Sequence, residues 1–187
     1  MALNRYYWPT KYNSRAEFLR QGVKCVFISH QKKDHLHAKK IADYLIQVDI
    51  DVYFDEYDTE LRLHHQEDNP SLVTTSILKG INNSSHMLVL VSPHTINSQW
   101  VPFEVGYGYD KTELSVMCLK GIPKGALPEY IRTARIIRDL YDLDYLIPNL
   151  SKSNVTHLKE ERKYFSHGDY SHPLKDVMDS LINDQYN

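Results

Sequence analysis

The sequence predicts an α/β protein with one doubly wound parallel sheet of about five strands. Short apolar runs of strand length alternate with stretches whose apolar residues recur at helical spacing. Residues 87–91, MLVLV, contain no polar side chain, which is typical of a parallel strand covered on both faces. A strand, a helix and a second strand in succession require a crossover connection, which favours parallel pairing.

The first expected elements are a short helix, a strand, a longer helix and a second strand. Ser14 and Glu17 form a possible capping box, which predicts the short helix. The first strand covers residues 25–28, Asp34 can cap the helix after it, and the second strand covers residues 52–54. The residues expected on the buried face of the longer helix are Ala38, Ile41, Ala42, Leu45 and Val48.

The middle of the chain contains an expected long loop and then another helix and strand. Residues 55–69 are acidic and show no sustained apolar period, and long loops within compact domains are usually functional or mobile. Asn69 and Pro70 suit the cap and first position of a helix, and the strand over residues 87–91 follows it. The next helix is expected to start near Ser98.

The last third of the chain predicts two further strands and two helices. Residues 114–119 form the fourth expected strand, and residues 135–138 form a short edge strand. A helical turn or two follows over residues 140–146, and Pro173 opens a segment with helical spacing. That segment predicts a closing amphipathic helix with the apolar residues Leu174, Val177, Met178, Leu181 and Ile182.

Length and composition predict one domain. The 187 residues carry a formal net charge of −2, without the basic excess of a nucleic-acid-binding protein. No signal peptide is recognisable, and no apolar run approaches the roughly 20 residues that span a bilayer. We therefore expect a cytoplasmic protein that binds neither nucleic acid nor membrane.

A candidate ligand site lies just after the third expected strand. Ser98 can accept hydrogen bonds from the backbone N–H groups that open the next helix, and Pro102 is tolerated in that first turn. Trp100 and Glu104 are four residues apart, so their side chains share one helix face. Ligands of open parallel sheets bind outside the carboxyl ends of the strands, which places Glu104 to meet one. Alternatively, Glu104 complements the helix dipole and Trp100 packs in the core.

The remaining reactive side chains do not predict a metal site or a nucleophile. His35 and His37 cannot share one helix face, and neither they nor the histidine pair at 64–65 have a Cys or carboxylate at a usual ligand spacing. Cys25 and Cys118 fall in strand-like apolar runs, so we expect reduced thiols in the core.

Four elements in this order resemble those of a TIR domain of the bacterial stand-alone kind. They are VFISH at 26–30, a helix, VYFD at 52–55 leading into the BB-loop region, and WVPFE at 100–104, which matches a Trp-x-x-x-Glu pattern. The resemblance spans residues 24–147 and implies the flavodoxin-like fold of these domains. The organisation that it implies is an N-terminal helical extension over 1–22, a TIR domain over 23–147, and a C-terminal extension over 148–187 that packs on that domain. The loop after Asp55 lacks the Pro-Gly turn of animal signalling TIR domains, which disfavours a receptor adaptor.

The resemblance implies an enzyme that cleaves the bond between nicotinamide and ribose in NAD⁺, an NAD⁺ glycohydrolase or ADP-ribosyl cyclase-like activity. Glu104 is the catalytic residue in this interpretation, because a carboxylate can stabilise the oxocarbenium-like ribose that remains. NAD⁺ is then the substrate, and no cofactor, metal or protein nucleophile is required.

The resemblance also implies the residues that surround Glu104. Phe27, Ser29 and His30 would line the nicotinamide-ribose side, and Trp100 would shape the neighbouring wall. Asp55 would border the site. Core packing remains an alternative for Phe27, and capping of the loop remains one for Asp55.

Three classes of function remain open from the sequence. The first is an NAD⁺-consuming enzyme of antiphage defence, similar to the TIR proteins of Thoeris systems, whose ADP-ribose-derived product, cyclic or conjugated, is read by a separate effector. The second is a non-catalytic TIR–TIR interaction module, in which Glu104 is replaceable. The third is a nucleoside deoxyribosyltransferase-like enzyme.

Self-association is a further implication of the resemblance. Active TIR assemblies build a composite site in which the BB loop of one subunit covers the adenine side of its neighbour. We therefore expect TIR–TIR contacts, with residues 55–69 in that role, and weak activity until a trigger orders the assembly.

Overall fold

Five parallel strands form the centre of the fold. The computed structural model describes residues 2–7, 22, 24–54, 70–123 and 125–182. The strands are β1 (Cys25–Ser29), β2 (Asp51–Tyr53), β3 (His86–Val91), β4 (Glu113–Cys118) and β5 (Arg135–Ile137). Their order in the sheet is β2-β1-β3-β4-β5, and every neighbouring pair is parallel. This is the flavodoxin-like order, so the predicted doubly wound sheet is confirmed.

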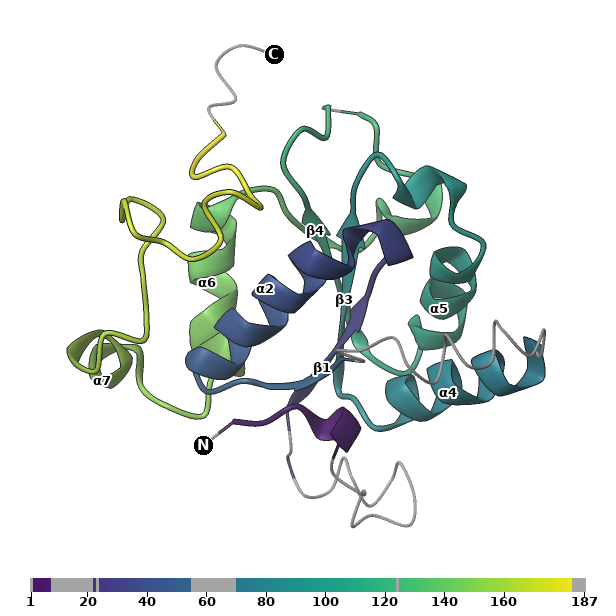
Figure 1. The fold of residues 1–187 in the computed structure, drawn as a ribbon, viewed down its shortest axis with the longest axis horizontal. Helices are drawn as coiled ribbons and strands as arrows, with labels where there is room; N and C mark the ends of the chain where they lie inside the picture. The colour runs from purple at the N-terminus through teal and green to yellow at the C-terminus, as the bar shows by residue number, and fades with distance from the viewer. Residues whose placement is uncertain (1, 8–21, 23, 55–69, 124, 183–187) are drawn as a thin grey trace.

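Helices cover both faces of this sheet (Figure 1). The α-helices are α2 (His35–Gln47), α4 (Pro70–Asn82), α5 (Trp100–Gly108), α6 (Leu140–Leu150) and α7 (Val155–Glu160). The 3₁₀ turns are η1 (Arg5–Tyr7), η2 (Lys32–Asp34), η3 (Thr95–Asn97) and η4 (Glu129–Ile131). Alternate residues of β1 enter different cores: Val26 and Ile28 pack with α2 and α6, whereas Cys25 and Phe27 pack with α4 and α5.

The topology creates a crevice between β1 and β3. The chain leaves β1 for α2 on one face of the sheet and leaves β3 for α5 on the other face (Figure 1). Neighbouring strands whose connections diverge in this way open a ligand site at their carboxyl ends. The start of α5, which the sequence singled out, lies at this edge.

The predicted closing helix over residues 173–182 is wrong, because this segment forms turns. The carbonyl of Val177 accepts from the N–H of Lys120 at 2.8 Å, and the carbonyl of Asp179 accepts from the N–H of Leu140 at 2.8 Å. These backbone groups bond to the domain and not along a helix. The apolar residues that the segment still buries against α2 and α6 are Leu174, Val177 and Met178.

The expected role of Asp34 also needs correction. Asp34 stands at the N-cap position of α2, but its side chain makes no capping hydrogen bond. It is buried, and its Oδ2 accepts from the hydroxyl of Ser92 instead. The carboxylate therefore joins the start of α2 to the end of β3.

Other expectations have mixed outcomes. Cys25 and Cys118 are buried free thiols, as predicted. The helix expected around Ser14 and the loop at 55–69 lie outside the described residues. Within the described ranges, no helix is long and apolar enough to cross a membrane.

Candidate active site

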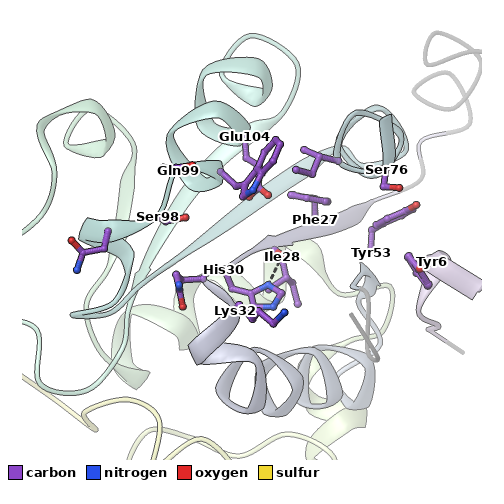
Figure 2. Close-up of a pocket in the computed structure, with 14 residues that line it drawn as sticks. Tyr6, Phe27, Ile28, His30, Lys32, Tyr53, Ser76, Ser98, Gln99 and Glu104 are labelled. Carbon is purple, nitrogen blue, oxygen red and sulfur yellow. Dashed lines mark hydrogen bonds between the residues drawn. The ribbon is translucent and has the colours of Figure 1, made fainter. Parts of the chain in front are cut away.

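A pocket of about 300 Å³ opens at the carboxyl end of β1, beside the starts of α2 and α5 (Figure 2). Five separate segments of the chain contribute to its wall. They supply Tyr6; Phe27, Ile28, His30, Gln31 and Lys32; Tyr53; Ser76 and Ile77; and Asn97, Ser98, Gln99, Trp100 and Glu104. The predicted ligand edge of the sheet thus carries a concave site.

Glu104 lies in this wall, and only 7% of its surface is exposed. The hydroxyl of Ser29, at the end of β1, donates a hydrogen bond to Glu104 Oε2. Burial raises the pKa of Glu104 to about 7, and the Ser29 hydroxyl opposes this rise because it stabilises the charged form. Glu104 therefore titrates near neutral pH, which suits a group that acts on a substrate.

The start of α5 aims two side chains at the pocket. Val101 donates its backbone N–H to Ser98 Oγ at 3.2 Å, so the predicted capping contact of Ser98 is confirmed. Trp100 and Glu104 both line the cavity, as their shared helix face predicts. The Trp100 ring also meets the Phe103 ring edge-on, with 6.0 Å between centroids.

One side of the pocket is aromatic. The rings of Phe27 and Tyr53 lie 6.2 Å apart, and the ring of Tyr6 meets Tyr53 edge-on at 5.7 Å (Figure 2). Gly80 of α4 allows this packing, because a Cβ there would lie 2.6 Å from Phe27 Cε2 and 2.8 Å from Tyr53 Cε1. This side suits a flat, weakly polar ring.

The other side of the pocket is polar. His30 and Lys32 follow β1 and lie across from Tyr53 and Tyr6 (Figure 2). The Nδ1 of His30 lies 3.3 Å from the carbonyl oxygen of Ile28, so this nitrogen is the donor. Lys32 brings a positive charge to this side.

Most of the predicted site residues come together. Those that line the pocket are Phe27, His30, Trp100 and Glu104. Ser29 is placed differently: it is 1% exposed and contacts the Glu104 carboxylate instead of the cavity. Asp55 lies outside the described residues. The roles of these residues in binding and catalysis stay predictions.

Ten of the fourteen lining residues were not among the predicted site residues, and three of them show why. Tyr53 pairs in register with Phe27, so a parallel alignment of the first two strands would have placed both rings on one face. Ser76 precedes Ile77, which lies on the buried face of α4. Tyr6 has no local signal, since its position depends on contacts with β2.

No metal centre forms among the residues that the structure describes, since no three His, Cys, Asp or Glu side chains gather there. The ring of His35 instead stacks on Phe54, with centroids 5.3 Å apart and an interplanar angle of 27°. The histidine pair at 64–65 lies outside the described ranges.

Comparison with known protein families gives a match. A family model described as TIR domain matches residues 26–145, which is more than half of the chain. No curated protein matches the chain. The matched region contains both members of the Ser29–Glu104 pair, whereas Tyr6 precedes it.

Proposed function

The chain belongs to the TIR domain family, and from this premise we propose that it cleaves the bond between nicotinamide and ribose in NAD⁺. The observation that carries the proposal is the buried Glu104 carboxyl, which lies in the pocket wall with a hydrogen bond from Ser29. A carboxylate in a dry, preorganised site acts most strongly where positive charge develops.

The proposed reaction needs one such group. When the glycosidic bond breaks, its electron pair stays on the nicotinamide nitrogen, which becomes neutral, and the ribose becomes oxocarbenium-like. The negative charge of Glu104 stabilises that ribose, and its oxygens can accept hydrogen bonds from the ribose hydroxyls. Water as acceptor gives ADP-ribose and a proton, whereas an atom of the same nucleotide as acceptor gives a cyclic isomer.

The two sides of the pocket support an orientation for NAD⁺. The aromatic side next to Phe27 and Tyr53 suits nicotinamide, and Lys32 on the opposite side suits the diphosphate. A cavity of about 300 Å³ is at the lower end of ligand pockets, so it suits nicotinamide and its ribose, with the adenosine half beyond it.

We further propose that the product is an ADP-ribose-derived nucleotide signal of antiphage defence, read by a separate effector. The likeness to bacterial stand-alone TIR proteins supports this. Self-association through TIR–TIR contacts is the matching proposal for regulation, because a pocket of this size leaves the adenine half for a neighbouring subunit to cover.

The test is incubation of the purified chain with NAD⁺, with nicotinamide and the second product identified by mass spectrometry. Glu104→Gln should lower nicotinamide release by about 100-fold or more, since removal of one preorganised group typically has this effect. Glu160→Gln, at an exposed site on α7, is the matched control and should keep full activity.

Other results would favour the alternatives. Equal activity of the Glu104→Gln and wild-type chains would rule out the proposed role of this carboxyl. A wild-type chain that releases no nicotinamide at any protein concentration would favour an interaction module. Release of a free base from deoxyribonucleosides, and not from NAD⁺, would favour deoxyribosyltransferase-like chemistry.

A further inference from the structure

The N-terminal segment is bonded to the outer edge of β2. Asn4 forms a parallel bridge with Val52, and the N–H of Val52 donates to the carbonyl of Leu3 at 3.2 Å. The Asn4 side chain also brackets Phe54: its Nδ2 donates to the Phe54 carbonyl at 2.6 Å, and its Oδ1 accepts from the Phe54 N–H at 3.1 Å. The segment therefore follows β2 in a defined register.

A buried ionic cluster holds the same segment. Asp51 is fully buried, and its Oδ2 accepts from Arg5 Nε at 2.7 Å and pairs with Nη2 at 2.5 Å. Its Oδ1 accepts from Lys152 Nζ at 2.5 Å and from the backbone N–H of Leu3 at 3.1 Å. A buried carboxylate with this many donors strongly favours one geometry, because loss of a partner leaves a charge unpaired.

These anchors place Tyr6 in the pocket. The backbone N–H of Tyr6 donates to Asn4 Oδ1 at 3.2 Å, and its ring packs edge-on against Tyr53. Figure 2 shows Tyr6 beyond Tyr53, on the side of the pocket away from Lys32. A residue outside the matched family region thus completes the aromatic side of the cavity.

We propose that Tyr6 is a substrate-binding residue, which makes the N-terminal segment part of the active site and contacts the nicotinamide ring of NAD⁺. This inference rests on the proposed function. Nicotinamide in NAD⁺ is a flat cation, which aromatic side chains attract through both packing and cation–π interaction. After cleavage the ring is neutral, so the second attraction is lost and product leaves more readily.

The primary test measures NAD⁺ binding by titration calorimetry in the Glu104→Gln chain, where turnover does not interfere. Adding Tyr6→Ala should raise the Kd for NAD⁺ roughly three- to tenfold, whereas Tyr6→Phe should keep it close to the parent value. Tyr170→Ala, at a tyrosine that is 93% exposed and far along the chain, should have no effect. The effect of Tyr6→Ala on NADH, whose nicotinamide is neutral, should be smaller than its effect on NAD⁺.

A second variant separates a binding role from a loss of fold. Asn4→Ala removes the bracket that holds Tyr6 without touching the cavity, so it should weaken NAD⁺ binding in the same direction. Because both changes act through one side chain, the double variant should bind no more weakly than Tyr6→Ala alone. Thermal unfolding of each variant checks that the domain remains folded.

Distinct results would overturn the two proposals. No NAD⁺ binding by the Glu104→Gln parent, together with no nicotinamide release by the wild-type chain, would overturn the proposed function and this inference together. An equal Kd with and without the Tyr6 ring would overturn this inference alone. Equal losses of affinity for Tyr6→Ala and Tyr6→Phe would show that the contact is not made by packing of the Tyr6 ring. Equal losses for NAD⁺ and NADH would show that Tyr6 does not recognise the charge of the nicotinamide ring.

Discussion

Ser29 and Glu104 are 75 residues apart in the sequence, yet the hydroxyl of Ser29 donates a hydrogen bond to the carboxyl of Glu104. The first residue ends β1 and the second lies near the start of α5. The contact therefore joins the two elements that flank the crevice, and it acts directly on the group proposed to perform catalysis.

Ser29→Ala should shift the pH dependence of activity upward. The hydroxyl stabilises the carboxylate, so its loss raises the pKa of Glu104 further above about 7. If the carboxylate is the active form, kcat/KM rises with pH through this pKa, and the variant should lose about tenfold at pH 7. Rate measurements across pH provide the check.

Ser115→Ala is the matched control, since Ser115 is a buried serine of β4 outside the pocket. It should leave the pH profile unchanged. An unshifted profile for Ser29→Ala would contradict the proposed link between the hydroxyl and the catalytic carboxyl.

Glu104→Gln should change how stability depends on pH. Burial raises the pKa of Glu104 from its ordinary value of 4.5 to about 7 in the folded chain. Between these values the folded state keeps a proton that the unfolded state has lost, so the free energy of unfolding falls as pH rises. The glutamine variant has no such proton, so its free energy of unfolding does not fall for this reason. Relative to wild type, its free energy of unfolding should therefore rise by about 3 kcal/mol between pH 4 and pH 8. Urea titrations at the two pH values measure this difference in stability. An equal change in both proteins would contradict the raised pKa of Glu104.

Gly80→Ala should disturb the aromatic side of the pocket. Its methyl group would lie within 3 Å of the rings of Phe27 and Tyr53, so these rings must move or the helix must shift. We expect a loss of about 1 to 3 kcal/mol in the free energy of unfolding, together with weaker NAD⁺ binding. Gly106→Ala is the control, because nothing lies within 4 Å of a Cβ there and alanine favours the helix. Equal stability of the two variants would show that the contact is relieved without cost.

Asp51→Asn should loosen the N-terminal segment. The change leaves Arg5 and Lys152 without a compensating charge, and disruption of a buried ion pair typically costs about 3 to 5 kcal/mol. Chemical unfolding measures the loss, and hydrogen exchange at Leu3 and Val52 locates it. Asp43→Asn, which breaks an exposed pair with Lys39, should cost under about 1 kcal/mol. Unchanged exchange at the edge of β2 would argue against the anchoring role.

Specific activity should increase with protein concentration if assembly completes the site. Nicotinamide release per chain, followed together with light scattering, tests this expectation. A constant specific activity without larger species would exclude activation by self-association.

The sequence alone determined the parallel strands of the sheet and most of the helices beside them. Residues 87–91 are apolar at every position, and the apolar positions after residue 34 recur at helical spacing, so β3 and α2 were found close to their true bounds. Trp100 and Glu104 were likewise placed on one helix face at the ligand edge. These features depend on the local periodicity of burial, which a single stretch of sequence contains.

Only the tertiary structure decided which distant residues meet. Tyr6 reaches the pocket because Asn4 and Arg5 bond to residues near position 50. The closing segment forms turns, although its apolar spacing is helical, because the carbonyls of Val177 and Asp179 bond to the domain. Such contacts form because buried donors and acceptors that lack a local partner bond to a distant one. The distant partners come within reach only once the chain has packed.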